Sequence, residues 1–301
     1  MNAPRDVLPA DLRRRVANLT LSARRAVEGL LSGMHRSPHR GASVVFVEHR
    51  EYRPGDDPRL LDWRAFARSD RHTIKRFEQE TQLSATLVLD ASGSMDFGAP
   101  VTKGEHAATL LAALGLILSR QGDAAGVVRF AREVLGSLPA RSRAAHLELI
   151  LGELARPIEP GTPTDLRASL VSVAERAGRR GVVAIASDLL DLGADGRLDE
   201  AALRPIDQLV HRGHDVLVFQ VLHPDELELP FEGPTRFLGT EGEAAIEVDP
   251  DAVRERYRAE LARFLEACRA RCTAAGARYR LVRTDEPIER VLAETLARRG
   301  G

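Results

Sequence analysis

The chain is poor in several residue types that would assign a protein quickly. Among its 301 residues there are only two cysteines and two lysines, Lys75 and Lys103. Cys268 and Cys272 are four positions apart in a stretch with helical periodicity, a spacing typical of neither a Cys-x-x-Cys redox pair nor half of a zinc site. We therefore expect two small buried hydrophobic residues in a reducing cytosol.

Other absences exclude whole classes of function. No apolar run approaches the roughly 18 residues needed to cross a bilayer, and we see no signal peptide. The 43 basic and 44 acidic residues leave no overall charge that would favour nucleic acid or a membrane surface. No Gly-x-x-x-x-Gly-Lys-[Ser/Thr] loop occurs, so any ATPase activity must come from another chain. We expect a cytoplasmic protein that associates with membranes only through partners.

What the chain does contain is a regular alternation of apolar strands and amphipathic helices. Its 44% hydrophobic residues are enough for a substantial core. We expect strands over residues 85–89, 126–131, 182–187, 215–222 and 278–282, with 134–138 as an antiparallel neighbour. Helices are predicted over 105–120, 143–155, 165–179, 200–212, 250–275 and 289–298. This order predicts an α/β fold with a doubly wound, mostly parallel sheet flanked by helices.

Two regions depart from this alternation. Residues 1–82 read as a small N-terminal extension, with a helix over 6–33 that packs on its own protein and strands over 44–53 and 73–81. Residues 83–301 form the predicted main domain. An acidic, proline-rich insert at about 224–249 interrupts it, with short strands expected at 236–238 and 245–248.

The segment Arg53-Pro-Gly-Asp-Asp-Pro-Arg59 joins the two N-terminal strands. Pro54 and Gly55 suit a type II turn, and Asp57 before Pro58 suits a helix N-cap followed by the first helical residue. The functional alternative is a carboxylate site. In it, Asp56, Asp57 and Asp62 would pair with neighbouring arginines. We favour the structural explanation because no nucleophile accompanies these residues.

The strongest chemical signal follows the strand at 85–89. Asp90, Ser92 and Ser94 place one carboxylate and two hydroxyls at every second residue, and Gly93 lets the backbone turn tightly. Three oxygens that converge on one point suit a hard cation. Mg²⁺ prefers octahedral oxygen coordination and usually keeps several waters.

A second strand at 182–187 ends on Asp188. In a doubly wound sheet, ligands bind outside the carboxyl ends of the strands, so Asp90 and Asp188 are predicted at the same edge. The loop Gly161-Thr162-Pro163-Thr164 lies between these strands in sequence and precedes a helix. A threonine hydroxyl there could serve as an N-cap, as a metal ligand, or as both.

This set of residues resembles the metal-ion-dependent adhesion site of von Willebrand factor type A domains. The resemblance implies that Asp90, Ser92, Ser94, Thr164 and Asp188 bind Mg²⁺, or Mn²⁺ or Ca²⁺ in its place. Thr164 fits the pattern better than Thr162. It also implies that one coordination position stays free for an acidic side chain of a partner.

Residues from Gly41 onward resemble the bacterial family of domain of unknown function fifty-eight, through Arg53-Pro-Gly-Asp-Asp, Asp62-Trp63 and Ala67-Arg68. The resemblance covers nearly the whole chain and includes Leu229-Pro-Phe231. It implies a von Willebrand A-like domain that works beside a MoxR-type AAA+ ATPase. The implied role is chaperone-like assembly or maturation of client proteins.

Two enzyme classes compete with this interpretation. A haloacid dehalogenase-like phosphatase needs a second carboxylate two residues after its first aspartate, and that position is Ser92. A serine hydrolase needs a Gly-x-Ser-x-Gly elbow, which Ala91 and Met95 do not provide. We therefore expect a protein-interaction module with no catalytic residues. A metal-dependent phosphatase or hydrolase, or a structural domain with a vestigial metal loop, remain the alternatives.

Overall fold

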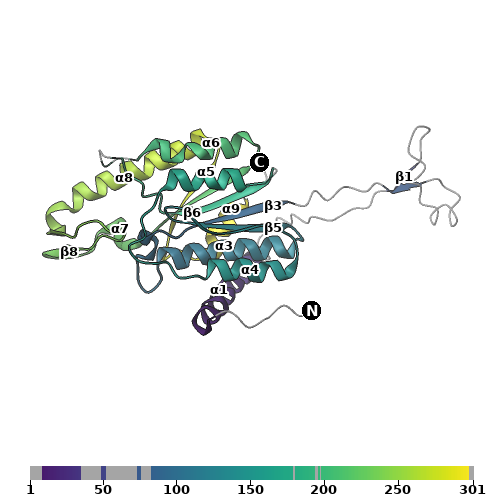
Figure 1. Ribbon diagram of the computed structural model, residues 1–301, viewed down its shortest axis with the longest axis horizontal. Helices are drawn as coiled ribbons and strands as arrows, with labels where there is room; N and C mark the ends of the chain where they lie inside the picture. Colours follow the sequence, from purple (N-terminus) through teal and green to yellow (C-terminus); the bar gives the residue numbers. More distant parts are fainter. Residues whose placement is uncertain are drawn as a thin grey trace. The chain divides into compact units, whose positions relative to one another are not determined.

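The computed structural model describes residues 9–34, 49–51, 73–75, 83–178, 180–193, 196 and 198–297. By their internal contacts the residues divide into two units. The larger unit comprises Met1–Met34 together with Leu83–Gly301, and the smaller one comprises His35–Gln82. Figure 1 labels the elements of both. No helix within the described ranges is long and apolar enough to span a membrane.

A six-stranded sheet forms the centre of the larger unit. Its strand order is β10-β7-β6-β3-β4-β5, and every neighbouring pair is parallel except β4 and β5. The strands are β3 Ser84–Asp90, β4 Ala124–Phe130, β5 Val134–Arg141, β6 Val182–Ser187, β7 Asp215–Leu222 and β10 Arg278–Arg283. The predicted doubly wound, mostly parallel sheet is confirmed, including the antiparallel neighbour at its edge.

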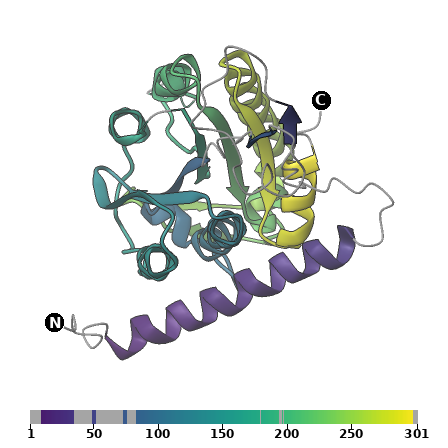
Figure 2. The same cartoon turned by 90° about the vertical axis from the view of Figure 1, so that its right-hand side faces the viewer.

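Helices cover both faces of this sheet (Figures 1 and 2). On one face lie α1 Ala10–Met34, α3 Lys103–Arg120, α4 Ala144–Leu154 and α9 Ile288–Ala297. On the other lie α5 Leu166–Arg176, η3 Glu200–Leu203, α6 Arg204–His211 and α8 Pro250–Ala274. The helix expected over 200–212 is therefore a 3-10 turn followed by an α-helix.

The central strands supply side chains to two separate cores. In β3, Leu87 and Leu89 belong to the core beneath α1 and α3, whereas Val88 belongs to the core beneath α5 and α6. Successive strand residues point to opposite faces, so a strand covered on both sides must be apolar at nearly every position. Cys268 and Cys272 are free thiols buried in the second core, as small hydrophobic residues would be.

The N-terminal helix belongs to the larger unit, which changes the predicted division at residue 82. Ala23 and Val27 are almost fully buried, and α1 contacts α3, α4 and α9. Figure 2 shows α1 lying along this helical layer. The apolar stripe of the helix completes the first core, so α1 groups with the sheet and not with the strand pair that follows it in sequence.

The smaller unit is described at two short strands. β1 His49–Glu51 and β2 Thr73–Lys75 pair antiparallel, with Arg50 opposite Ile74. Both fall within the strands predicted at 44–53 and 73–81. The rest of those predicted strands, and the segment at 53–63, lie outside the described residues.

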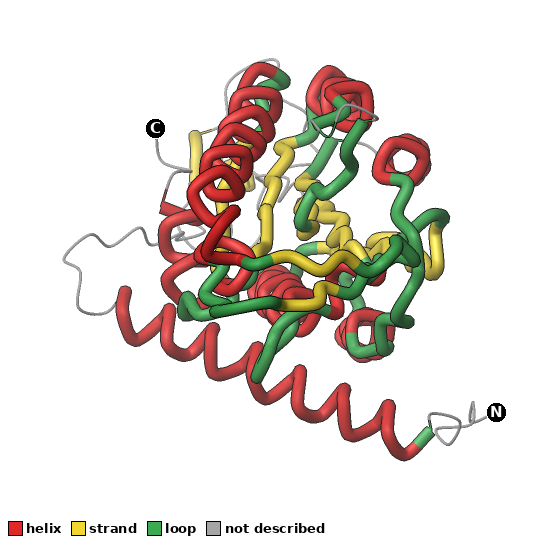
Figure 3. The backbone as a smooth tube through the Cα atoms, turned by 90° about the vertical axis from the view of Figure 1, so that its left-hand side faces the viewer, coloured by secondary structure: helices red, strands yellow, loops and turns green. Residues whose placement is uncertain are grey.

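The insert follows β7 and contains three short elements. These are α7 Pro224–Glu228, β8 Thr235–Phe237 and β9 Ile246–Val248, the last two paired antiparallel. Both strands agree with the sequence prediction, but α7 was not expected. It begins with Pro224 at its first turn and a capping box between His223 and Glu226. Figure 3 views the domain from the side on which β8 lies in Figure 1.

Candidate metal site at the sheet edge

The two predicted aspartates lie at the carboxyl ends of adjacent strands. β3 and β6 are parallel, with Leu89 opposite Ala186, so Asp90 is next to Ser187 and Asp188. The Ser187 hydroxyl donates a hydrogen bond of 2.5 Å to Oδ2 of Asp90. Both aspartates are 2% exposed. The structure thus brings together two carboxylates that the sequence separates by almost a hundred residues.

Directly after β3, the loop folds its two hydroxyls back onto Asp90. Oδ1 of Asp90 accepts hydrogen bonds from the Ser92 amide at 2.9 Å and from the Ser92 hydroxyl at 2.7 Å. Ser92 Oγ lies 3.1 Å from Ser94 Oγ. A 3-10 turn, η2 Gly93–Asp96, carries Ser94 into this position. Three of the five predicted ligands therefore form one connected oxygen cluster.

The environment of Asp90 opposes its negative charge. Burial, and then the charge of Asp188, raise the pKa of Asp90 to about 7, although hydrogen bonds from Ser187 and Ser92 lower it in part. Its hydrogen-bond donors among the described residues, the amide and hydroxyl of Ser92 and the hydroxyl of Ser187, are all neutral. A cation next to Asp90 would therefore stabilise the ionised form.

Thr164 and Thr162 differ in what their hydroxyls contact. Thr162 Oγ1 donates to the carbonyl of Glu159 at 2.7 Å. Thr164 Oγ1 is buried and has no hydrogen-bond partner among the described residues. The cap of α5 is Asp165, whose side chain accepts from the Ala168 amide, so Thr164 does not have the capping role that its position allowed. Because buried hydroxyls are normally hydrogen-bonded, this one is available as a ligand for a metal ion.

Asp188 has a different set of partners. Its Oδ2 accepts a hydrogen bond of 2.8 Å from the ammonium of Lys103, which also donates to Glu226 Oε1 at 2.6 Å. Lys103 is completely buried. Burial lowers the pKa of Lys103, but the carboxylates of Asp188 and Glu226 outweigh this effect and raise it. A permanent cation therefore lies beside one of the two aspartates.

Sequence reasoning missed Lys103, which is the first residue of α3. The helix begins there because Thr102 and Glu105 form a capping box. A lysine in the first helical turn opposes the helix dipole and is normally solvated. Only the fold brings two carboxylates to it, so no local signal could have singled it out.

The backbone after β6 is shaped to hold Asp188. Leu189 has a φ of 58°, in the left-handed region that non-glycine residues rarely adopt. This turn lets the Leu190 amide donate to Asp188 Oδ1 at 3.1 Å, and Gln220 Nε2 donates to the Asp188 carbonyl at 2.7 Å. Since Lys103 donates to Oδ2 and Leu190 to Oδ1, both carboxylate oxygens of Asp188 accept hydrogen bonds.

A residue of the insert also reaches this edge of the sheet. Glu241 Oε2 accepts a hydrogen bond of 2.8 Å from the Thr164 amide. Its other oxygen, Oε1, is buried and has no partner in the part of the chain that the structure describes. Burial raises the pKa of Glu241, while hydrogen bonds from Thr164 and Ser94 lower it in part. Neither the sequence pattern nor the resemblance indicated this contact.

The chemistry of the site is dominated by hydroxyl groups. Within the described ranges, no three His, Cys, Asp or Glu side chains gather as a metal-binding group. A transition-metal site built from imidazole or thiolate is therefore not found there. The oxygens of Asp90, Ser92, Ser94 and Thr164 are hard ligands, which suit Mg²⁺, Mn²⁺ or Ca²⁺.

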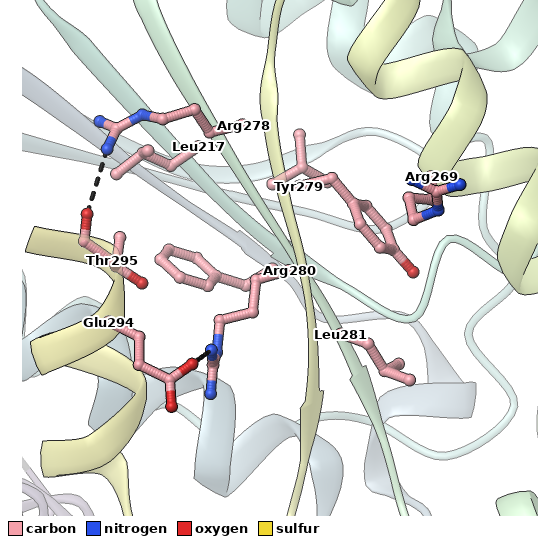
Figure 4. Close-up of a pocket in the computed structure, with 10 residues that line it drawn as sticks. Leu217, Arg269, Arg278, Tyr279, Arg280, Leu281, Glu294 and Thr295 are labelled. Carbon is pink, nitrogen blue, oxygen red and sulfur yellow. Dashed lines mark hydrogen bonds and ion pairs between the residues drawn. The ribbon is translucent and has the colours of Figure 1, made fainter. Parts of the chain in front are cut away.

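A cavity of about 340 Å³ lies elsewhere, along β10 (Figure 4). Its arginines are paired: Arg269 with Glu266, Arg278 with Asp215, and Arg280 with Glu286 and Glu294. Figure 4 shows Arg278 directed at the Thr295 carbonyl and Arg280 at Glu294. These guanidinium groups are already engaged by carboxylates, so we do not assign an anion site to this cavity.

Comparison with known sequences identifies the family. The model described as "Protein of unknown function DUF58" matches residues 48–266. The chain belongs to this family. Uncharacterized proteins of Mycobacterium bovis and Mycobacterium tuberculosis are 30% identical to this DUF58 protein over 264 residues, which is 84% of this chain and 80% of theirs.

Solved structures similar to this DUF58 protein include bacterial proteins of low sequence identity. A conserved hypothetical protein, BatB, from Bacteroides thetaiotaomicron has a TM-score of 0.44 and 17% identity, covering 72% of this chain and 98% of that one. An aerotolerance-related membrane protein from Bacteroides fragilis has a TM-score of 0.45 and 20% identity, covering 72% and 97%. A von Willebrand factor type A protein from Catenulispora acidiphila has a TM-score of 0.38 and 11% identity, covering 74% and 44%.

Proposed function

We propose that this DUF58 protein is a non-enzymatic, Mg²⁺-dependent protein-interaction module. Asp90, Ser92, Ser94 and Thr164 would hold the ion, and Asp188 would contribute from the neighbouring strand. When bound, the ion supplies an electrophilic centre that attracts a carboxylate. The observation that carries the proposal is the buried, unpartnered hydroxyl of Thr164 at the edge where Asp90 ends its strand.

The donor set supports a cation in preference to another occupant. Hydroxyl ligands carry no charge, so a divalent ion held by them keeps much of its attraction for an outside carboxylate. Ser92 and Ser94 now satisfy each other and Asp90 by hydrogen bonds, and each retains lone pairs on its oxygen. The residues present therefore fit a hard cation without rearrangement of the sheet.

A binding role is favoured over catalysis by the residue at position 92. A metal-dependent phosphatase needs an acid–base group near Asp90, and the side chain there is a hydroxyl bonded to Asp90 itself. Lys103 is buried and bonded to two carboxylates, so its proton is not available for transfer. The proposal therefore assigns no catalytic residue.

The proposed partners are a MoxR-type AAA+ ATPase and its client protein, in chaperone-like assembly or maturation. This step rests on the family resemblance and on the absence of a Walker loop from the sequence. The module would act in the cytoplasm, where an ATPase partner has its nucleotide. An acidic side chain of the partner would complete the coordination of the ion.

Titration calorimetry tests the metal site. We expect Mg²⁺ and Mn²⁺ to release or absorb heat with the wild type and to give no binding heat with Asp90→Ala. The matched control is Asp96→Ala, which removes an exposed carboxylate from the same loop and should bind like the wild type. Equal binding by Asp90→Ala would reject the site.

Retention of a purified MoxR-type ATPase on the immobilised protein tests the partner. Because the ATPase itself needs Mg²⁺ for nucleotide, the comparison should be made between variants and not by chelation alone. We expect retention by the wild type and by Asp96→Ala, and loss with Asp90→Ala and Ser92→Ala. Equal retention by all four proteins would mean that the ATPase does not bind through the metal site.

A further inference from the structure

The structure contains an acidic side chain in the place that the proposed function leaves to a partner. We infer that Glu241 is an internal ligand of the candidate metal site and that it closes the site to an outside carboxylate. The inference rests on the proposed function and adds to it how the site is regulated. Glu241 belongs to the loop between β8 and β9, far from the site in sequence.

The contacts of Glu241 point to the hydroxyl ligands. One carboxylate oxygen accepts from the Thr164 amide at 2.8 Å, and the proximity of Ser94 lowers the pKa of this carboxyl group in part. Its second oxygen, Oε1, and the Thr164 hydroxyl oxygen are both buried, and neither has a hydrogen-bond partner within the described ranges. These two oxygens belong to different segments, and their residues are joined by a hydrogen bond, so we infer that they share a ligand. A buried carboxylate oxygen with nothing to bind would otherwise cost free energy.

The backbone holds the loop against the site. The Thr240 carbonyl accepts from the Gly161 amide at 3.0 Å. A Cβ atom added at Gly93 would lie 2.1 Å from that same carbonyl, so only glycine permits the approach. The Glu241 amide donates to Glu243 Oε2 at 2.9 Å. Both flanks of the metal site, at Gly93 and Gly161, are therefore in contact with the residue before Glu241.

This arrangement makes the insert a gate for partners. With Glu241 in place, the coordination position that an outside carboxylate would take is already occupied. The negative charge of Glu241 also repels that carboxylate. Displacement of the short loop would free the position without disturbing the central sheet, because β8 and β9 form a separate two-stranded sheet. A partner would therefore have to bind the insert as well as the ion.

The test uses Mn²⁺ as probe on the full chain. Electron paramagnetic resonance gives its affinity, water-proton relaxation gives the number of waters on the bound ion, and acetate serves as a simple outside carboxylate. The variants are Glu241→Ala, the more conservative Glu241→Gln, Asp90→Ala, and Glu247→Ala as an exposed control on β9. Circular dichroism confirms that each is folded.

We expect Glu241→Ala to weaken Mn²⁺ binding about tenfold, as loss of one charged ligand does, with a smaller effect for Glu241→Gln. The bound ion should gain water in Glu241→Ala, and acetate should displace that water in this variant but not in the wild type. Glu247→Ala should match the wild type. Equal affinity, hydration and acetate response in wild type and Glu241→Ala would overturn the inference while leaving the metal site standing. Absence of any Mn²⁺ binding sensitive to Asp90 would instead overturn the proposed function, and the inference with it.

Discussion

Asp90 and Asp188 end neighbouring parallel strands, are equally buried, and have opposite surroundings. Asp90 is bonded to the amide and hydroxyl of Ser92 and to the hydroxyl of Ser187, all neutral groups. Asp188 is bonded to the ammonium of Lys103, with Glu226 on the other side of that ammonium. One carboxylate lacks a charged partner and the other already has one.

The difference separates two tasks that the sequence pattern treats alike. A carboxylate among hydroxyls remains able to bind a cation, whereas a carboxylate paired with lysine contributes to the stability of the apo fold. We therefore interpret Asp90 as the principal charged ligand and Asp188 as the link between the site and the core. The four predictions that follow test this division, from the largest expected effect to the smallest.

Replacing Lys103 by methionine should be the most damaging change. It leaves the buried Asp188 and the half-buried Glu226 with no cation between them, which we expect to lower the free energy of unfolding by about 3–5 kcal/mol. Urea denaturation measures this. The control is Arg263→Met, which breaks an exposed pair with Glu260 of the same 2.6 Å length and should cost less than about 1 kcal/mol. Equal losses of unfolding free energy would mean that the ion pairs of Lys103 contribute no more to stability than an exposed pair does.

The two aspartates should respond differently to the same substitution. Asp188→Asn weakens the bond to Lys103 and should lower the free energy of unfolding by about 1–3 kcal/mol. Asp90→Asn removes like-charge repulsion and keeps acceptor and donor atoms for Ser92 and Ser187, so metal-free stability should be unchanged or higher. Thermal denaturation without divalent ions compares them. A larger loss for Asp90→Asn would reverse the assignment of roles.

Added Mg²⁺ should stabilise the wild type, since a ligand that binds only the folded state shifts the unfolding equilibrium. At ten times the dissociation constant the gain is about 1.4 kcal/mol. We expect Asp90→Asn to lose this gain and Asp188→Asn to keep part of it. Calorimetric scans with Mg²⁺, and with K⁺ at matched ionic strength as control, measure the difference. A gain that survives Asp90→Asn would place the ion elsewhere.

The threonine pair should show the smallest and most specific effects. Thr164→Val removes a hydroxyl that has no partner, so we expect weaker Mg²⁺ binding by severalfold with little change in stability. Thr162→Val removes the bond to the Glu159 carbonyl and should cost about 1 kcal/mol with Mg²⁺ affinity unchanged. Calorimetric titration and urea denaturation of both variants test the pair. The opposite pattern would make Thr162 the ligand.

Much of the fold could be predicted because it depends on local patterns. β7 has the predicted bounds, residues 215–222. β6 also has its predicted bounds and ends at Ser187, directly before Asp188. Buried parallel strands are short apolar runs, and such runs are recognisable without knowledge of their neighbours. Since the carboxyl ends of parallel strands meet at one edge, the placement of Asp90 and Asp188 at the same edge followed from the fold class. Their proximity depends also on the strand order, which puts β3 beside β6.

The parts that were missed depend on contacts between distant segments. Lys103 is paired with residues 85 and 123 positions away, and Glu241 reaches Thr164 across 77 positions. No periodicity encodes such contacts, because they arise from how loops meet above the sheet. The grouping of α1 with the main unit has the same origin, since its apolar stripe was visible but its packing partner was not.

Two leucines with left-handed backbones bracket the lysine network. Leu189 follows Asp188 directly, and Leu229, with a φ of 45°, ends the short helix that carries Glu226. Each conformation costs about 1–2 kcal/mol, and each leucine side chain is buried, which offsets that cost. The chain on the C-terminal side of each acid is therefore fixed in an uncommon conformation by the burial of a leucine. We expect the lysine network to keep its geometry when an ion binds, so that Asp90 and the loops adjust to the ion and Lys103 does not.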